Sequence, residues 1–174
     1  ALDDDLRWLV AMISDTGMRL SEAVGLRQED LHLDHTNPYL EITPHAARRL
    51  KTASSKRVIP LVGEALWAAQ RVARADQLFC FPRYCNETVC KSNSASAAIN
   101  KWLKSVIGDA YVIHGLRHSF RDRLRNVGAN TELIDQLGGW SLQTIGQGYG
   151  DGYSLEFCSL WMGKLIKKPV PRLI

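Results

Sequence analysis

The stretch HGLRHSF, residues 114–120, places two histidines and one arginine within five positions. It follows the segment DAYVI and precedes the basic run RDRLR. Because an α-helix turns by about 100 degrees per residue, we expect a helix from about 115 to 127 with two distinct faces. The basic face would carry His114, Arg117, His118 and Arg121. The apolar face would carry Leu116, Phe120, Leu124 and Val127.

His114 stands at the start of this predicted helix, where free backbone N–H groups favour an anion. A phosphate group is the natural ligand for such a place. The alternative is a solvated basic face with a histidine cap, so further motifs are needed to decide between the two.

Helical periodicity dominates most of the chain. Leu6, Leu9, Val10 and Ile13 recur at steps of three and four after an acidic cluster, Asp3 to Asp5, that suits the start of a helix. We expect further helices at about 21–26, 64–75, 95–106, 131–137 and 155–166. Residues 77–94 are predicted to form a loop.

The segment 39–61 differs from the rest of the chain. YLEIT and RVIPL flank the polar and basic stretch HAARRLKTASSK, a pattern that predicts two or three short antiparallel strands with a hairpin exposing basic side chains. The fold class is therefore mainly α with a small antiparallel β-sheet (α+β). We expect one domain over residues 1–174, with a core at about 3–166 and a loosely held tail at 167–174.

Composition narrows the class of protein without defining a function. The chain has 174 residues, of which 45% are hydrophobic, enough for one globular core. No apolar run approaches the roughly 20 residues of a membrane span, and the start, ALDDDLRW, is acidic, so we expect a soluble intracellular chain. The net charge of +4 and the pI near 9.0 are compatible with a polyanionic partner.

The four cysteines are Cys80, Cys85, Cys90 and Cys158. They contain no CxxC pair, and their spacing does not fit common zinc sites. We expect free thiols in a reducing compartment.

Three further stretches carry candidate functional residues. In TGMRLSEAVGL, Arg19 precedes Glu22 by three positions, so the carboxylate can hold the guanidinium while other donors face a ligand. In RRLKTASSKRVIPL, Lys51 lies toward the tip of the predicted hairpin. In LIDQLGGWSLQTIGQGYGDGY, Trp140 precedes Tyr149 by nine positions. Taken singly, each feature is also common as surface or core decoration.

Taken together and in this order, the motifs resemble the catalytic domain of the tyrosine recombinases, the phage integrase family. The resemblance extends from about residue 3 to 166 and implies an integrase-type catalytic fold. Relatives usually carry an N-terminal helical domain that clamps the other face of the DNA. We expect this domain to be absent from the present chain.

The resemblance implies a role for each candidate residue. Arg19 and Arg117 match the two arginines that bind the phosphate, and Trp140 matches a third donor position where many relatives carry histidine. Tyr149 matches the nucleophile, His114 the residue that manages its proton, and Lys51 the general acid for the leaving 5′ oxygen. Glu22 and His118 are expected to support these groups. Tyr153 lies four positions after Tyr149 and is the competing nucleophile.

The implied activity is that of a site-specific DNA recombinase that forms a 3′-phosphotyrosine intermediate. No nucleotide-binding GxxxxGK[ST] loop and no set of spaced carboxylates is present, so we expect neither cofactor nor metal. The expected partners are double-stranded DNA and further copies of the chain, dimer to tetramer, through the C-terminal segment after about Ser154. We expect a cytoplasmic, DNA-associated protein from a bacterium or phage.

Two alternatives remain open. A type IB topoisomerase would share the nucleophile and the cationic pocket but would relax supercoils without pairing two sites. A DNA-binding module without catalysis would bind DNA and break no bond.

Overall fold

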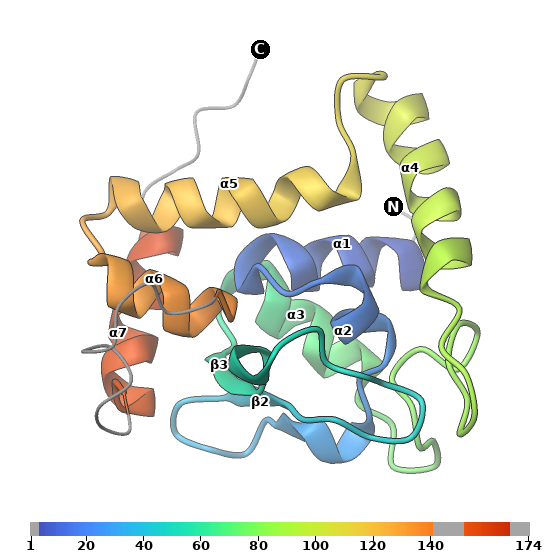
Figure 1. Cartoon of the computed structure of the whole chain (residues 1–174), viewed down its shortest axis with the longest axis horizontal. Coiled ribbons are helices and arrows are strands. Elements are labelled where there is room, and N and C mark those ends of the chain that lie inside the picture. The colour runs from blue at the N-terminus through green and yellow to red at the C-terminus, as the bar shows by residue number, and fades with distance from the viewer. Residues whose placement is uncertain (1–3, 141–151, 168–174) are drawn as a thin grey trace.

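The computed structural model describes residues 4–140 and 152–167 (Figure 1). Its helices are α1 Asp5–Thr16, α2 Leu20–Val24, α3 Gly63–Val72, α4 Ser92–Ile107, α5 Ile113–Asn126, α6 Thr131–Gly138 and α7 Leu155–Lys167. Its strands are β1 Leu31–His32, β2 Tyr39–Ile42 and β3 Arg57–Pro60. Across these described ranges, no helix is both long and apolar enough to cross a membrane.

Helix α1 occupies the centre of the domain, and local chemistry sets both of its ends. The Asp4 side chain accepts hydrogen bonds from the backbone N–H groups of Leu6 and Arg7, which confirms the predicted acidic cap. The helix ends at Gly17, whose φ of 63° is accessible to glycine at little cost. This turn directs the chain into α2.

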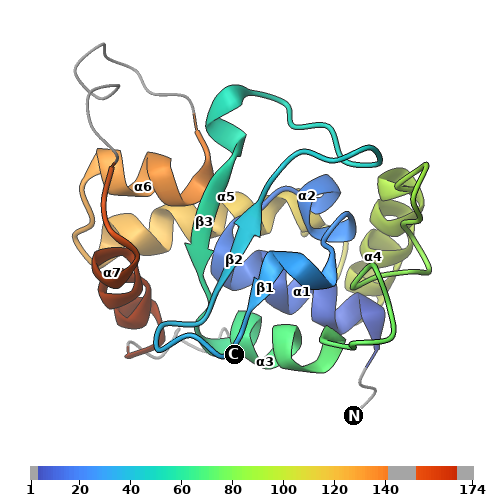
Figure 2. The same ribbon diagram turned by 90° about the horizontal axis from the view of Figure 1, so that it is seen from below.

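The strands form one antiparallel sheet in the order β1-β2-β3 (Figure 2). Leu40 of β2 pairs with Ile59 of β3, and both side chains are buried. The predicted strands within 39–61 are confirmed, but the third strand, Leu31–His32, lies before that segment. The long connection from β2 to β3 carries Lys51.

The helices pack around α1 in a mainly α arrangement, as predicted. Helices α3 and α5 pack directly against α1, and α6 and α7 pack against α5 (Figure 1). Where a helix range was predicted, expected and observed ends agree to within three residues, with the largest shifts at the end of α3 and at the start of α4. The first turn of α5 lies beside the turn between α1 and α2, because Arg117 of α5 donates a hydrogen bond to the Gly17 carbonyl.

The predicted faces of α5 require one correction. Arg117 is 4% exposed and shares the buried face with Ile113, Phe120 and Leu124, whereas Leu116 is only half-buried. Steps of four, three and four residues along this set follow one stripe of a helix. Arg117 therefore points into the domain, and His114 and His118 stay exposed.

The expectation of four free thiols is wrong for one pair. Cys85 and Cys90 form a disulfide, while Cys80 and Cys158 are free and buried. The two paired residues form an isolated antiparallel bridge that brings their Cα atoms to 4.1 Å. Their sequence separation did not reveal this turn.

Candidate active site

Arg19 and Glu22 form the predicted pair at the start of α2. Arg19 Nη1 lies 2.7 Å from Glu22 Oε1, and the backbone N–H of Arg19 donates to Glu22 Oε2 at 2.8 Å. The carboxylate thus satisfies a free N–H at the helix start and holds the guanidinium at the same time. Arg19 also donates to Ser55 Oγ at 3.0 Å, which connects α2 to the β2–β3 connection.

Glu22 holds a second arginine that the sequence motifs did not single out. Arg57 Nη2 lies 3.0 Å from Glu22 Oε2, and both side chains are less than 5% exposed. Burial raises the pKa of Glu22, but the charge and hydrogen bonds of Arg57 and Arg19 outweigh it and lower this pKa below its ordinary value of 4.5. Glu22 is therefore an ionised carboxylate between two guanidinium groups.

Arg117 reaches the same region from α5. Its Nη1 donates to the backbone carbonyl of Gly17, and its guanidinium lies 4.3 Å from the centroid of the Trp140 ring. Burial, followed by the charges of Arg19 and Arg57, lowers the pKa of Arg117 to about 10. The group stays charged at neutral pH. Its Nη2 is buried and has no hydrogen-bond partner among the described residues.

Trp140 follows the end of α6 and lies against two arginines. The ring centroid is 4.3 Å from the guanidinium carbon of Arg117 and 4.8 Å from that of Arg121. Such cation–π contacts contribute about 0.5–2 kcal/mol each. A Cβ on Gly138 would lie 1.6 Å from the Trp140 ring, so this glycine gives the ring its space. The contacts of Trp140 here involve its ring face, whereas the sequence suggested a role for its indole N–H.

His114 and His118 lie on the exposed side of α5, with ring centroids 5.1 Å apart. Burial, followed by the nearby charges of His118, Arg117, Arg19 and Lys51, lowers the pKa of His114 below its ordinary 6.5. At neutral pH His114 is therefore uncharged and able to accept a proton.

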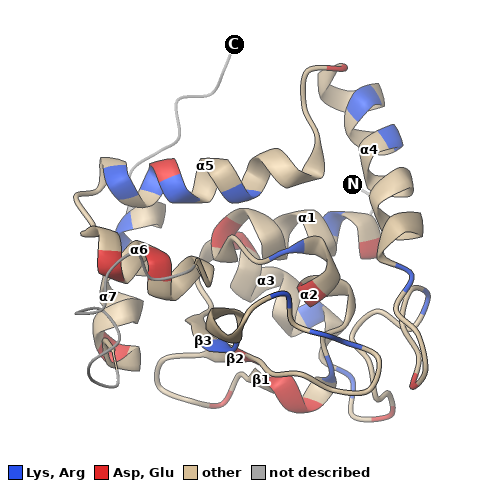
Figure 3. Cartoon of the chain, viewed as in Figure 1, with Lys and Arg blue, Asp and Glu red and all other residues tan. Residues whose placement is uncertain are grey.

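Lys51 is exposed on the connection between β2 and β3. Thr52, the next residue, shares a hydrogen bond of 3.0 Å between its hydroxyl and that of Ser55, the residue bound by Arg19. The charge of Lys51 also acts on His114. Lys51 thus adds to the positive charge that Arg19 and Arg117 place around His114. Figure 3 shows basic residues along α5 and on the β2–β3 connection.

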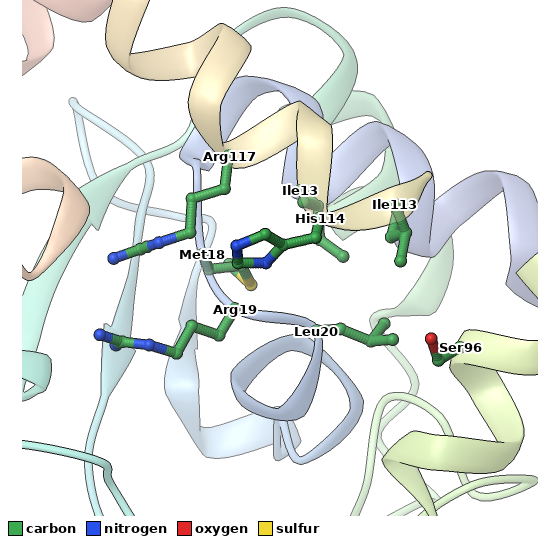
Figure 4. A pocket seen from close by; sticks show the side chains of 8 residues that line it. All are labelled: Ile13, Met18, Arg19, Leu20, Ser96, Ile113, His114 and Arg117. Atoms are coloured by element: carbon green, nitrogen blue, oxygen red, sulfur yellow. The ribbon is translucent and has the colours of Figure 1, made fainter. Parts of the chain in front are cut away.

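A cavity of about 140 Å³ opens between these elements. It is lined by Ile13, Met18, Arg19, Leu20, Ser96, Ile113, His114 and Arg117. The guanidinium groups of Arg19 and Arg117 and the ring of His114 project to the same side (Figure 4). Two guanidinium groups placed in this way can bind several oxygens of one anion.

Tyr149, the predicted nucleophile, lies outside the described residues. Tyr153 is described, and its hydroxyl accepts from Asn130 Nδ2 at 2.7 Å and lies 3.4 Å from Glu132 Oε2. Asn130 caps the start of α6, whereas Trp140 follows its end. Helix α6 has eight residues and is about 12 Å long, so the Tyr153 hydroxyl and Trp140 lie at opposite ends of it.

Two buried arginines were missed from the sequence. Arg57 stands two positions before the buried Ile59 on β3, so strand alternation was a usable signal that it faces inward. Arg48 pairs with Asp30 at 3.0 Å from an irregular segment, and no periodic signal marks it.

The structure thus shows an α+β domain in which Arg19 and Arg117, from separate elements, line one cavity. A model of the phage integrase family matches residues 2–153. The chain belongs to the phage integrase family.

Solved structures of tyrosine recombinases share the fold. The Tn1549 transposon integrase in complex with transposon right end DNA is 21% identical with a TM-score of 0.54, and the match covers 91% of this chain and 58% of that one. XerA recombinase is 18% identical with a TM-score of 0.58 and coverage of 97% and 65%. The chain thus spans 58% of the Tn1549 integrase structure. A comparison with curated protein sequences found no match.

Proposed function

We propose that this domain is the catalytic part of a site-specific DNA recombinase that cuts and rejoins DNA strands through a 3′-phosphotyrosine intermediate. The carrying observation is the convergence of Arg19 and Arg117, with the buried Arg117 Nη2 free of partners among the described residues. A buried, charged donor without a hydrogen-bond partner destabilises the fold unless a ligand accepts its hydrogen bond. A DNA phosphate fits this requirement.

The two arginines suit the transition state of phosphoryl transfer. As the phosphorus becomes five-coordinate, negative charge spreads over its equatorial oxygens, and fixed guanidinium groups stabilise that charge. Glu22 holds Arg19, and the Gly17 carbonyl and the Trp140 ring hold Arg117. Because these contacts exist before DNA binds, little reorganisation is needed during the reaction.

Proton transfer is assigned to His114 and Lys51. The Tyr149 oxygen attacks the phosphorus and its proton passes to neutral His114, while the bond from phosphorus to the 5′ oxygen breaks and Lys51 protonates that oxygen. The products are a 3′-phosphotyrosine and a free 5′-hydroxyl. A 5′-hydroxyl of another strand reverses the same steps and rejoins the DNA.

Tyr149 is the better nucleophile candidate than Tyr153. The Tyr153 hydroxyl is engaged by Asn130 and Glu132 at the start of α6. Trp140, which contacts Arg117, follows the other end of that helix. Tyr153 therefore lies away from the arginines and serves to pack α7 against α6.

Membership of the phage integrase family supports a recombinase over the two alternatives, a type IB topoisomerase and a DNA-binding module without catalysis. The solved Tn1549 integrase structures are described as complexes with transposon DNA or circular intermediate DNA, which supports double-stranded DNA as the partner here. The basic residues of α5 and the β2–β3 connection supply the matching charge (Figure 3).

Self-association on DNA is part of the proposal. Helix α7 buries Met162 and Cys158 but exposes Leu160 and Phe157, at 62% and 38%. A second copy would remove these apolar side chains from water. Analytical ultracentrifugation with and without DNA tests this assembly, with Leu160→Glu expected to weaken it and to leave DNA binding by the monomer intact.

The decisive experiment is a denaturant-quenched incubation with supercoiled plasmid at low salt in the presence of EDTA. The wild-type chain is compared with Tyr149→Phe and Tyr153→Phe. We expect a protein–DNA adduct that survives denaturant, is lost in Tyr149→Phe and persists in Tyr153→Phe. Loss in Tyr153→Phe alone would overturn the assignment of the nucleophile.

If the wild type forms no adduct, the experiment is repeated with nicked DNA. Cleavage beside the nick releases a short strand that carries the 5′-hydroxyl, and once this strand diffuses away the phosphotyrosine cannot be rejoined and accumulates. If the nicked DNA binds but still yields no adduct, the non-catalytic module is the better description. Plasmid relaxation without joining of two sites would indicate topoisomerase activity.

A further inference from the structure

We propose that Arg57 is a positioning residue that holds Arg19 and Trp140 in place beside Arg117. This inference rests on the proposed function, because it assigns Arg57 a role in the same site. Arg57 binds no DNA itself, since its guanidinium is buried and bonded to protein groups from three segments.

Two of the three contacts of Arg57 join parts of the chain that are distant in sequence. Its Nη2 donates to Glu22 Oε2 at 3.0 Å, its Nη1 to the Ser55 carbonyl at 2.7 Å, and its Nε to the Leu137 carbonyl at 2.9 Å. The first contact reaches the carboxylate that holds Arg19. The last reaches the end of α6, three residues before Trp140.

The end of α6 is shaped around Arg57. Gly139 has a φ of 62°, and a Cβ at this position would lie 2.6 Å from Arg57 Nη1. The backbone therefore approaches the guanidinium closely before it turns into Trp140. A shift of Arg57 would move this turn, and with it the ring that lies on Arg117.

The charge balance gives Arg57 a second effect on the site. Glu22 is shared by Arg19 and Arg57, and the charge of Arg57 is the main influence that favours ionised Glu22 against burial. Without Arg57, a single guanidinium would face this buried carboxylate. Arg19, which already bonds Glu22 Oε1, would then turn to bind Oε2 as well, and its remaining donors would leave the anion site.

Lysine cannot reproduce this arrangement. An ammonium group is a single point with no planar fork, so it cannot reach the Glu22 carboxylate, the Ser55 carbonyl and the Leu137 carbonyl in the observed directions. We therefore expect Arg57→Lys to keep the charge and to lose much of the positioning, with a milder defect than Arg57→Met.

Arg48 supplies a matched control. It is as buried as Arg57, pairs with Asp30 at 3.0 Å and donates to the carbonyls of Thr43 and Gly25. Its contact with Glu22 is to the backbone carbonyl, at 3.5 Å, and not to the carboxylate. Arg48→Met therefore removes a comparable buried ion pair and leaves the contacts of Arg19 and Trp140 in place.

The test combines two readouts that a loss of stability alone would leave unchanged. The first is the NMR resonance of the Trp140 indole N–H among the five tryptophans, assigned with Trp140→Phe. The second is the rate of adduct formation at saturating DNA, measured well below the melting temperature of each variant. Arg57→Met should shift the Trp140 resonance and slow adduct formation about 100-fold, because small misplacements of catalytic groups cost that much. Its DNA affinity should fall far less.

Arg48→Met should leave both readouts near the wild-type values even where it lowers the melting temperature. Equal defects in Arg48→Met and Arg57→Met would reduce Arg57 to a general stabilising residue and overturn the proposal. So would an unshifted Trp140 resonance with wild-type cleavage in Arg57→Met. If Arg57→Met does not fold, Arg57→Lys and Arg48→Lys are compared with the same expectations and the same criteria.

The two proposals fail in different ways. A wild-type chain that forms no adduct contradicts the proposed function, yet the Trp140 resonance still reports whether Arg57 positions that segment. If the wild type is active and Arg57→Met changes neither the Trp140 resonance nor the cleavage rate, only the positioning role of Arg57 is contradicted.

Discussion

Arg117 donates a hydrogen bond to the backbone carbonyl of Gly17, a residue 100 positions earlier in the chain. Gly17 forms the turn that separates α1 from α2, and Arg19 lies two positions further on. One contact therefore sets the start of α5 against the start of α2. This is how two arginines from distant motifs come to line the same cavity.

The turn at Gly17 predicts a large effect of Gly17→Ala on stability. The left-handed φ of 63° and a Cβ only 2.2 Å from Phe120 Cδ1 make alanine both strained and overpacked. We expect a loss of about 2–5 kcal/mol in the free energy of unfolding, measured by urea denaturation. Gly163→Ala on α7 is the control, since no atom of the described residues lies within 4 Å of its added Cβ, and it should be neutral or slightly stabilising.

A wild-type stability for Gly17→Ala would show that the turn and Phe120 adjust without cost.

The buried carboxylate of Glu22 predicts a stability difference that depends on pH. Glu22→Gln leaves Arg57 without its charged partner, so we expect a loss of about 3–5 kcal/mol at pH 7. Because the folded state lowers the pKa of Glu22 below 4.5, its contribution is present above that pH and is lost as the pH falls through the lowered value. The gap between variant and wild type should therefore narrow in acid.

Glu29→Gln is the matched control for that series. Glu29 pairs with Arg27 at 2.8 Å but is 67% exposed, so its removal should change stability by less than about 1 kcal/mol. A Glu22→Gln variant as stable as Glu29→Gln would contradict a structural role for the buried pair.

The lowered pKa of His114 predicts the acid side of the pH–rate profile. Adduct formation should be nearly constant above pH 6.5 and should decline below the lowered pKa, where His114 is protonated and cannot accept the tyrosine proton. His118→Gln removes the residue whose charge has the largest lowering effect on this pKa after burial, so the decline should begin at a higher pH. An unchanged profile in His118→Gln would argue that another group limits the rate in acid.

Lys51 is tested with DNA in which sulfur replaces the 5′ oxygen that leaves. On ordinary DNA, Lys51→Ala should form the adduct about 100- to 10,000-fold more slowly than the wild type. A thiolate leaves without a proton because thiols are far more acidic than alcohols, so the sulfur-containing DNA should restore most of the lost rate. Lys56→Ala, an exposed lysine of the same connection, should be close to the wild type on both substrates. Failure of sulfur to rescue Lys51→Ala would reassign Lys51 to phosphate binding.

The parts of the fold that sequence predicted well are those with local causes. The acidic cap of α1 at Asp4, the helix ranges and the pairing of Arg19 with Glu22 all depend on residues within four positions of one another. Helix geometry brings such residues together wherever the segment lies in the domain. The order and spacing of the motifs likewise indicated the phage integrase family before any packing was known.

The local patterns of residue types predicted the helices, the two strands within 39–61, the family and the candidate residues from Arg19 to Tyr149. The burial of Arg117, the pairing of Cys85 with Cys90 and the link that Arg57 makes between Glu22 and the end of α6 are visible only once the chain is packed. Arg57 lies 35 positions from Glu22 and 80 from Leu137, and Arg117 lies 100 from Gly17. Contacts at such separations depend on how whole helices and strands pack, which no local pattern of residue types specifies.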